Sequence, residues 1–186
     1  MINVTELRSG IVFEERGEYF LVMQYEHIKM GRGGGTIKVR VKNLTSGANI
    51  DKSFPNGARV QDAVLERKKV QYLYRDGENF NFMENSTFEQ FALPKSLIGT
   101  YVPYLKEGLE IVLFSIGERP MYVELPKILD YKITQTGGGS KGNTVGAAQK
   151  DALLENGLHV KVPLFIKNGE VIRVDTRSGA YVERAK

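Results

Sequence analysis

The sequence predicts an all-β protein built of three small β-barrel domains in series. Short runs rich in branched and aromatic residues recur along all 186 residues, and turns containing Gly, Asp, Asn or Pro separate them. No long amphipathic helix interrupts this pattern. Regularly spaced short strands of this kind are typical of small barrels. We place the three domains at residues 1–64, 65–126 and 127–186.

The clearest strand of the first domain is the segment 37–42, which alternates apolar residues with cations. A period of two puts the apolar side chains on the core face and gathers the cations on the other face. The apolar members are Ile37, Val39 and Val41, and the cations are Lys38, Arg40 and Lys42. Further strands are expected at 10–15, 19–25 and 48–54.

A strand-like run extends from Val60, at the end of the first domain, to Arg75 in the second, and Asp76-Gly77 predicts a hairpin turn after it. A turn with a short helical piece is expected at 85–91, and a helix at 94–104. The remaining strands of the chain are expected at 80–83, 110–115, 121–125, 129–134, 152–154, 159–163, 170–175 and 181–182.

A glycine-rich loop at 29–36 lies between two strands of the first domain. Its glycines leave no side chains to shield Arg32, which we expect to project into solvent as a planar charged group suited to phosphate. From His27 to Ile50 there are five cations and no carboxylate. Taken alone, such a loop is more often a solvated turn than a binding site, so both interpretations stay open on this evidence.

The charges are distributed unevenly along the chain. Residues 1–64 carry 9 cations and 7 acids, residues 65–126 carry 7 and 9, and residues 127–186 carry 10 and 6. Two basic ends suggest contact with a polyanion at two places, although differences of this size also arise by chance. Besides the strand cations and Arg32, the candidate contacts are the loop residues Lys141, Gly142, Asn143 and Thr144, and a C-terminal cluster of Arg173, Arg177, Arg184 and Lys186 with Tyr181 as a stacking platform.

Composition and motifs give little support for an enzyme. The chain has no cysteine, and its two histidines, His27 and His159, are far apart in sequence. Neither a P-loop nor a GxSxG elbow is present, and the glycines near Arg32 do not open a helix as a dinucleotide-binding motif would. We therefore expect a binding protein without cofactor or metal. No apolar run could span a membrane and no signal peptide is evident, so a cytoplasmic protein is expected.

Several segments of the chain carry the pattern of a known family. Residues 150–169 and 169–184 resemble the C-terminal signature and the closing segment of bacterial elongation factor P. Residues 72–77, followed by Phe82-Met83 and by residues 87–90, are similar to the family as well. The resemblance covers essentially the whole chain.

The resemblance implies an N-terminal SH3-like barrel of the KOW type followed by two OB-fold barrels, arranged in a bent shape like that of tRNA. It also implies a monomeric factor that binds the 70S ribosome between the P and E sites, near rRNA and ribosomal proteins. Such a factor stimulates peptide-bond formation at consecutive prolines by positioning peptidyl-tRNA. The alternatives are a paralogous factor with a different stalling-motif preference and a general single-stranded RNA-binding OB-fold protein.

By the same resemblance, Arg32 is the tip residue near the peptidyl-transferase centre. It resembles the arginine that a dedicated glycosyltransferase modifies with rhamnose in some members. The loop of Lys141, Gly142, Asn143 and Thr144 corresponds to the segment that approaches the E-site codon of mRNA. The expected contacts with tRNA or rRNA are Lys29, Gly31, Arg32, Gly33, Lys38, Arg40, Lys42, Arg177, Tyr181 and Arg184.

Overall fold

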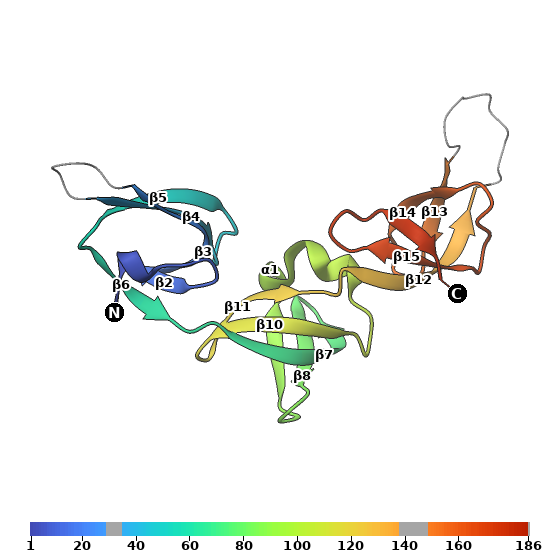
Figure 1. The fold of residues 1–186 in the computed structure, drawn as a ribbon. Helices are drawn as coiled ribbons and strands as arrows, with labels where there is room; N and C mark the ends of the chain where they lie inside the picture. Colours follow the sequence, from blue (N-terminus) through green and yellow to red (C-terminus); the bar gives the residue numbers. More distant parts are fainter. Residues whose placement is uncertain (29–34, 138–148, 186) are drawn as a thin grey trace. The chain divides into compact units, whose positions relative to one another are not determined.

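The computed structural model describes residues 1–28, 35–137 and 149–185 (Figure 1). The described chain is mostly antiparallel β-structure in three curled sheets, which confirms the all-β class. Contacts divide the chain into two compact units, one of Met1–Lys68 with Leu113–Tyr122, the other of Lys69–Val112 with Val123–Lys186. The division into three domains therefore stays a prediction, since part of the middle sheet packs with the first sheet.

The first sheet has the strand order β1-β6-β2-β3-β4-β5. Its strands are β1 (Ile2–Asn3), β2 (Val12–Glu15), β3 (Glu18–Ile28), β4 (Thr36–Asn43), β5 (Asn49–Pro55) and β6 (Arg59–Ala63). The alternation in β4 is confirmed, because Ile37, Val39 and Val41 are buried in the core of this sheet. The short strand β1 carries no periodic pattern and was not expected.

A hairpin of β10 (Glu110–Ile116) and β11 (Arg119–Glu124) contributes to the first compact unit. Met121 forms a small buried cluster with Val12 and Leu44. On the same hairpin, the rings of Phe114 and Tyr122 stack with their centroids 4.5 Å apart. These contacts make the hairpin part of the support of the first sheet.

The middle sheet has the order β11-β10-β7-β8-β9, with β7 (Glu66–Asp76), β8 (Asn79–Glu84) and β9 (Gln90–Pro94). Two expectations are wrong here. The strand expected over residues 60–75 is broken between β6 and β7, and no helical piece forms within residues 85–91. Phe88 has a left-handed φ of 60° and donates its N–H to the carbonyl of Glu84, so this segment turns directly into β9. The helix expected at 94–104 is confirmed as α1 (Lys95–Ile98) and a 3-10 helix (Gly99–Tyr104).

The third sheet has the order β14-β13-β12-β15-β16. Its strands are β12 (Ile128–Thr136), β13 (Gln149–Leu154), β14 (His159–Pro163), β15 (Val171–Asp175) and β16 (Tyr181–Arg184). The two edge strands β14 and β16 contact each other, which curls the sheet toward closure. In its core, the buried hydroxyl of Tyr131 donates a hydrogen bond to the carbonyl of Tyr104 at 2.5 Å.

Each sheet contains a β-bulge in one long strand. The register shifts between Val22 and Gln24 in β3, between Tyr72 and Tyr74 in β7, and between Ile133 and Gln135 in β12. An extra residue on one strand increases local twist and bends the strand. The bulges therefore help these short sheets to curl around their cores.

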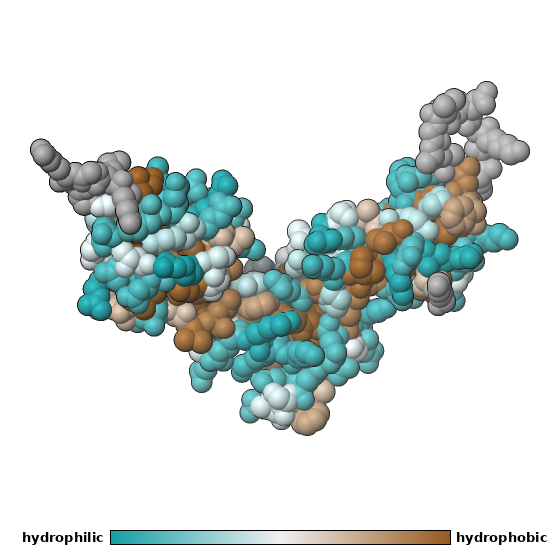
Figure 2. Space-filling view, in the orientation of Figure 1, coloured by the Kyte–Doolittle hydropathy of each residue, from teal (hydrophilic) through white to brown (hydrophobic). Residues whose placement is uncertain are grey.

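The surface of the described chain is largely polar on the face drawn in Figure 2, where hydrophilic residues predominate and hydrophobic areas lie between them. Within residues 1–28, 35–137 and 149–185, no helix has the length and apolar character needed to cross a membrane.

Candidate nucleic-acid interface

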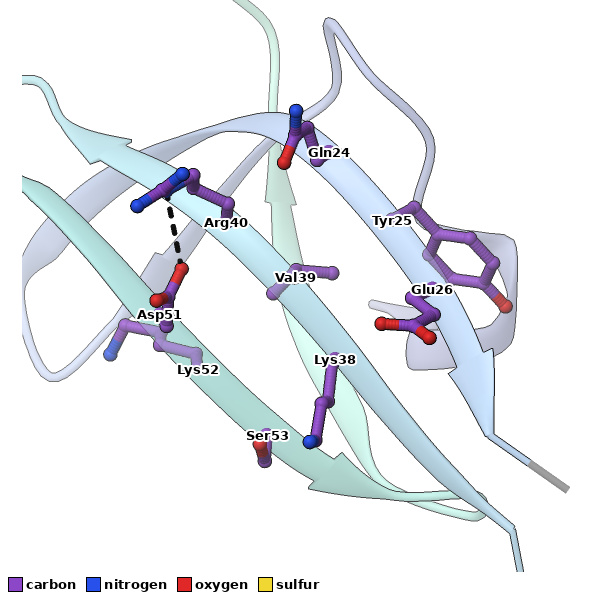
Figure 3. A pocket seen from close by; sticks show the side chains of 9 residues that line it. All are labelled: Gln24, Tyr25, Glu26, Lys38, Val39, Arg40, Asp51, Lys52 and Ser53. Carbon is purple, nitrogen blue, oxygen red and sulfur yellow. Dashed lines mark ion pairs between the residues drawn. The ribbon is translucent and has the colours of Figure 1, made fainter.

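Two of the three cations expected on one strand face, Lys38 and Arg40, line an open hollow of about 740 Å³ on β3, β4 and β5 (Figure 3). Cross-strand pairing places six polar side chains there in two rows of three. One row is Gln24, Arg40 and Asp51, and the other is Glu26, Lys38 and Ser53. We call these six residues the polar grid.

The polar grid depends on the bulge at Met23. Val22 pairs with Val41 in the core, but the next pair along the strands joins Gln24 to Arg40. The extra residue shifts the alternation of β3 by one position, so that Tyr25 packs against the core while Gln24 is exposed. Without this shift, Gln24 would point toward the core instead of lying beside Arg40.

The polar grid contains two cations and two carboxylates. The Nε of Arg40 lies 3.4 Å from Oδ1 of Asp51, and the two side chains remain 57% and 77% exposed. Glu26 pairs with Lys38 across β3 and β4, and directly opposed residues of an antiparallel sheet have Cβ atoms about 5 Å apart. The six residues of the polar grid are therefore formally neutral together, although the grid lies on the strand face expected to be cationic.

Lys42 lies apart from the polar grid, although it belongs to the same alternating series. Its Nζ is 5.6 Å from the centroid of the Tyr122 ring, a cation–π arrangement with the hairpin of β10 and β11. The side chain is partly buried, whereas Lys38 and Arg40 are exposed. Of the three strand cations, Lys42 thus has the clearest structural role.

The base of the glycine-rich loop is well defined at Gly35. A Cβ at this position would lie 3.0 Å from Nε2 of His27 and 3.2 Å from the carbonyl oxygen of Ile28. The carbonyl of Gly35 accepts a hydrogen bond from the N–H of Asn56 at 2.9 Å. Close approach favours glycine here, because a Cβ would require the His27 ring and the Ile28 carbonyl to give way by a few tenths of an ångström.

In the third sheet, Arg177 is held by Asp175 through several hydrogen bonds. Its Nη2 and Nε donate to the two carboxylate oxygens at 2.5 and 3.1 Å, and its backbone N–H donates at 2.8 Å. These bonds from Arg177 hold the pKa of the Asp175 carboxyl well below its usual range. Gly179, with a φ of 72°, closes the turn by donating its N–H to the carbonyl of Asp175.

The other arginines of the C-terminal cluster also have carboxylate partners. Arg184 lies 3.3 Å from Glu170, and Arg173 lies 2.6 Å from Glu183. The hydrogen bond with Glu183 is the main cause that raises the pKa of Arg173. Tyr181 begins β16 opposite Val174 and is partly exposed, so its ring is available at the edge of the sheet.

Two groups of candidate residues lie outside the described residues. They are Lys29, Gly31, Arg32 and Gly33 of the first loop, and Lys141, Gly142, Asn143 and Thr144 of the second, together with Lys186. Within the described ranges, no three His, Cys, Asp or Glu side chains gather as a metal site would require. Among the described candidates, Lys38 and Arg40 share the polar grid. Tyr181 and Arg184 belong to β16 of the third sheet, and Arg177 lies in the turn between β15 and β16.

Comparison with known proteins identifies the class first. A KOW-like domain model of elongation factor P matches residues 3–60, the OB domain model matches residues 65–123, and the C-terminal model matches residues 129–184. The fold is similar to a translation initiation factor 5A from Methanococcus jannaschii, at a TM-score of 0.54 and 21% identity, over 66% of this chain and 92% of that one. A translation initiation factor 5A family protein from Naegleria fowleri has a TM-score of 0.52 and 14% sequence identity, over 67% of this chain and 96% of that one. The domain models place the chain in a class of translation factors with a KOW-like and an OB domain, and the two solved structures share its fold.

Full-length relatives narrow the class to one family. Elongation factor P of Moorella thermoacetica is 38% identical over 185 residues, covering 100% of both chains. Elongation factor P of Clostridium kluyveri is 42% identical over 185 residues, covering 99% of this chain and 100% of that one. The chain belongs to the elongation factor P family. This family consists of translation factors that interact with the ribosome and tRNA, which confirms that the protein is not an enzyme.

Proposed function

We propose that this translation elongation factor binds the ribosome between the P and E sites and stimulates peptide-bond formation at consecutive prolines by positioning peptidyl-tRNA. The observation that carries the proposal is the match of all three family models in order along the chain. Such a factor works by placing reactants, because holding two reactants in a productive geometry lowers a barrier without supplying an acid, a base or a metal.

In this proposal, Arg32 is the residue that reaches the peptidyl-transferase centre. Its loop joins β3 and β4, two long paired strands whose pairing continues to Ile28 and Thr36. The hydrogen bond from the N–H of Asn56 to the carbonyl of Gly35 and the pairing of Ile28 with Thr36 hold the base of the loop. Because the first sheet holds the base of the loop, the position of that sheet on the ribosome determines where Arg32 can reach.

The remaining contacts follow the family resemblance. We assign Arg177, Tyr181 and Arg184 to tRNA, and the loop of Lys141 to Thr144 to the E-site codon of mRNA. An arginine-modifying glycosyltransferase is the partner proposed for Arg32, and the factor is proposed to act as a cytoplasmic monomer. Intact mass of protein from its native host tests the modification: the mass of one added deoxyhexose is expected, and an unshifted mass contradicts it.

The test of the tip residue is Arg32→Ala in reconstituted translation of a Pro-Pro-Pro reporter. The variant is expected to fold normally and to lose rescue of the stalled ribosome, since a small misplacement of reactants costs on the order of a hundredfold in rate. Arg67→Ala is the matched control, because Arg67 is an exposed arginine of β7 outside the candidate contacts. Undiminished rescue by Arg32→Ala would show that the tip assignment is wrong.

A general single-stranded RNA-binding protein would behave differently in a binding assay. It would hold free single-stranded RNA about as tightly as it holds ribosomes, and with a strong dependence on salt. A paralogous factor would rescue a different stalling motif, so the same reconstituted system with other reporters separates it from the proposed function.

A further inference from the structure

The segment 27–50, which contains five cations and no carboxylate, has a carboxylate at each end. Glu26 precedes His27, and Asp51 follows Ile50. The sheet register brings both back beside the cations of that stretch, Glu26 opposite Lys38 and Asp51 opposite Arg40. We propose that Glu26 and Asp51 are specificity-determining residues that keep this strand face from binding RNA on charge alone.

A cation that already lies beside a carboxylate contributes less to RNA binding than a free one. Basic side chains bind nucleic acid by neutralising phosphates and releasing the counterions condensed on them. Arg40 already has Asp51 at 3.4 Å, and a phosphate approaching it meets the repulsion of that carboxylate. Lys38 has Glu26 as its cross-strand neighbour on the same face. The polar grid therefore adds little to affinity for an arbitrary RNA.

The polar grid can bind a phosphate when other contacts hold the RNA in place and the two carboxylates are displaced from the cations. Lys38 and Arg40 occupy the central strand, and Gln24 and Ser53 stand at opposite corners with an amide and a hydroxyl that can donate hydrogen bonds (Figure 3). Both acids are exposed, and the exposed ion pair of Asp51 with Arg40 is of the kind that contributes little to stability. RNA held in place by other contacts of the factor can displace them, whereas free RNA gains no such help.

A protein partner is less well supported at this face. The side chains exposed on the polar grid are all polar or charged, whereas the centre of a protein–protein interface is depleted in charge and enriched in aromatic residues. The proposal rests on the proposed function only in taking RNA as the polyanion. Its main measurement, binding of free RNA, needs neither a ribosome nor a proline stall, so the two proposals can fail separately.

The experiment compares the wild-type protein with the double variant Glu26→Gln/Asp51→Asn. Binding to a short single-stranded RNA of mixed sequence is measured across a salt titration. Freeing two cations is expected to steepen the slope of log K against log salt by about 1.4, which makes the loss of affinity between about 50 and 200 mM salt roughly sevenfold larger. Far-UV circular dichroism verifies that the variant is folded.

The control is Glu66→Gln/Glu118→Gln, which removes two exposed carboxylates from the same compact unit and produces the same net charge. It is expected to change the slope much less. Adding Lys38→Gln and Arg40→Gln to the double variant is expected to restore the wild-type slope. The proposal is overturned if the double variant binds RNA like the wild type or like the control. It is also overturned if RNA binding is unchanged while ribosome binding falls, which would indicate a protein partner.

Discussion

Arg40 in the first sheet and Arg177 in the third are both paired with an aspartate, but the two pairs differ in construction. Arg40 makes one contact of 3.4 Å with Asp51, which lies on the neighbouring strand β5. Arg177 makes two side-chain contacts and one backbone contact with Asp175, two residues earlier in the same turn. The first pair is a product of strand register, and the second is a product of local sequence.

If both arginines contact RNA as proposed, the difference between the two pairs determines how each guanidinium is presented to a phosphate. Exposed single-contact pairs contribute little to stability, so Arg40 can exchange Asp51 for a phosphate at small cost. Charge-assisted bonds to two carboxylate oxygens fix the guanidinium of Arg177, and the same carboxylate also organises the turn. We expect Arg177 to present its remaining N–H groups from a fixed position, and Arg40 to adjust to its ligand.

The largest effect is expected from comparing Asp175→Ala with Asp51→Ala. Asp175→Ala removes the acceptor for the Arg177 side chain and backbone, so a clear fall in the denaturation midpoint is expected. Asp51→Ala is expected to change the free energy of unfolding by less than about 1 kcal/mol. Urea denaturation of both variants measures this, and equal losses of stability would remove the distinction between the two pairs.

A smaller effect is expected in the pH dependence of stability. The pKa of Asp175 is lowered in the folded protein, chiefly by the Arg177 hydrogen bond, so the ionised carboxylate stabilises the fold. That contribution is fully present above the unfolded-state pKa of about 3.9 and is lost as pH falls through the lower pKa of the folded state. The stability difference between wild type and Asp175→Asn should therefore shrink as pH falls below about 4. A difference that stays constant down to the acid transition would contradict this account of Asp175.

Much of the fold could be predicted from local pattern. The alternation of Ile37, Val39 and Val41 indicates a strand with one buried face, and the structure has that strand and that face. The segment 85–91 could not be predicted in the same way, because Phe88 adopts a left-handed φ that its residue type disfavours. The bulge at Met23 also has no clear local signal, since it arises from how two strands pair.

In the candidate interface too, features with a local sequence signal could be predicted, whereas those that depend on strand pairing could not. The turn around Asp175, Arg177 and Gly179 has the residue types that favour it, so its ion pair could have been inferred locally. The ion pair of Arg40 with Asp51 depends on the register of β4 against β5, which could not be predicted from the sequence. The position of Glu26 opposite Lys38 could have been predicted. If Ile28 pairs with Thr36 across the loop, the same register pairs Glu26 with Lys38.

The most direct test of the central claim measures the rate of peptide-bond formation at a Pro-Pro-Pro stretch in reconstituted translation, with and without the wild-type protein. A template of equal length without consecutive prolines is translated in parallel. The account predicts acceleration by on the order of tenfold or more on the proline template and little change on the other, since positioning matters most where reactants are poorly placed. An equal effect on both templates, or none on either, would contradict it.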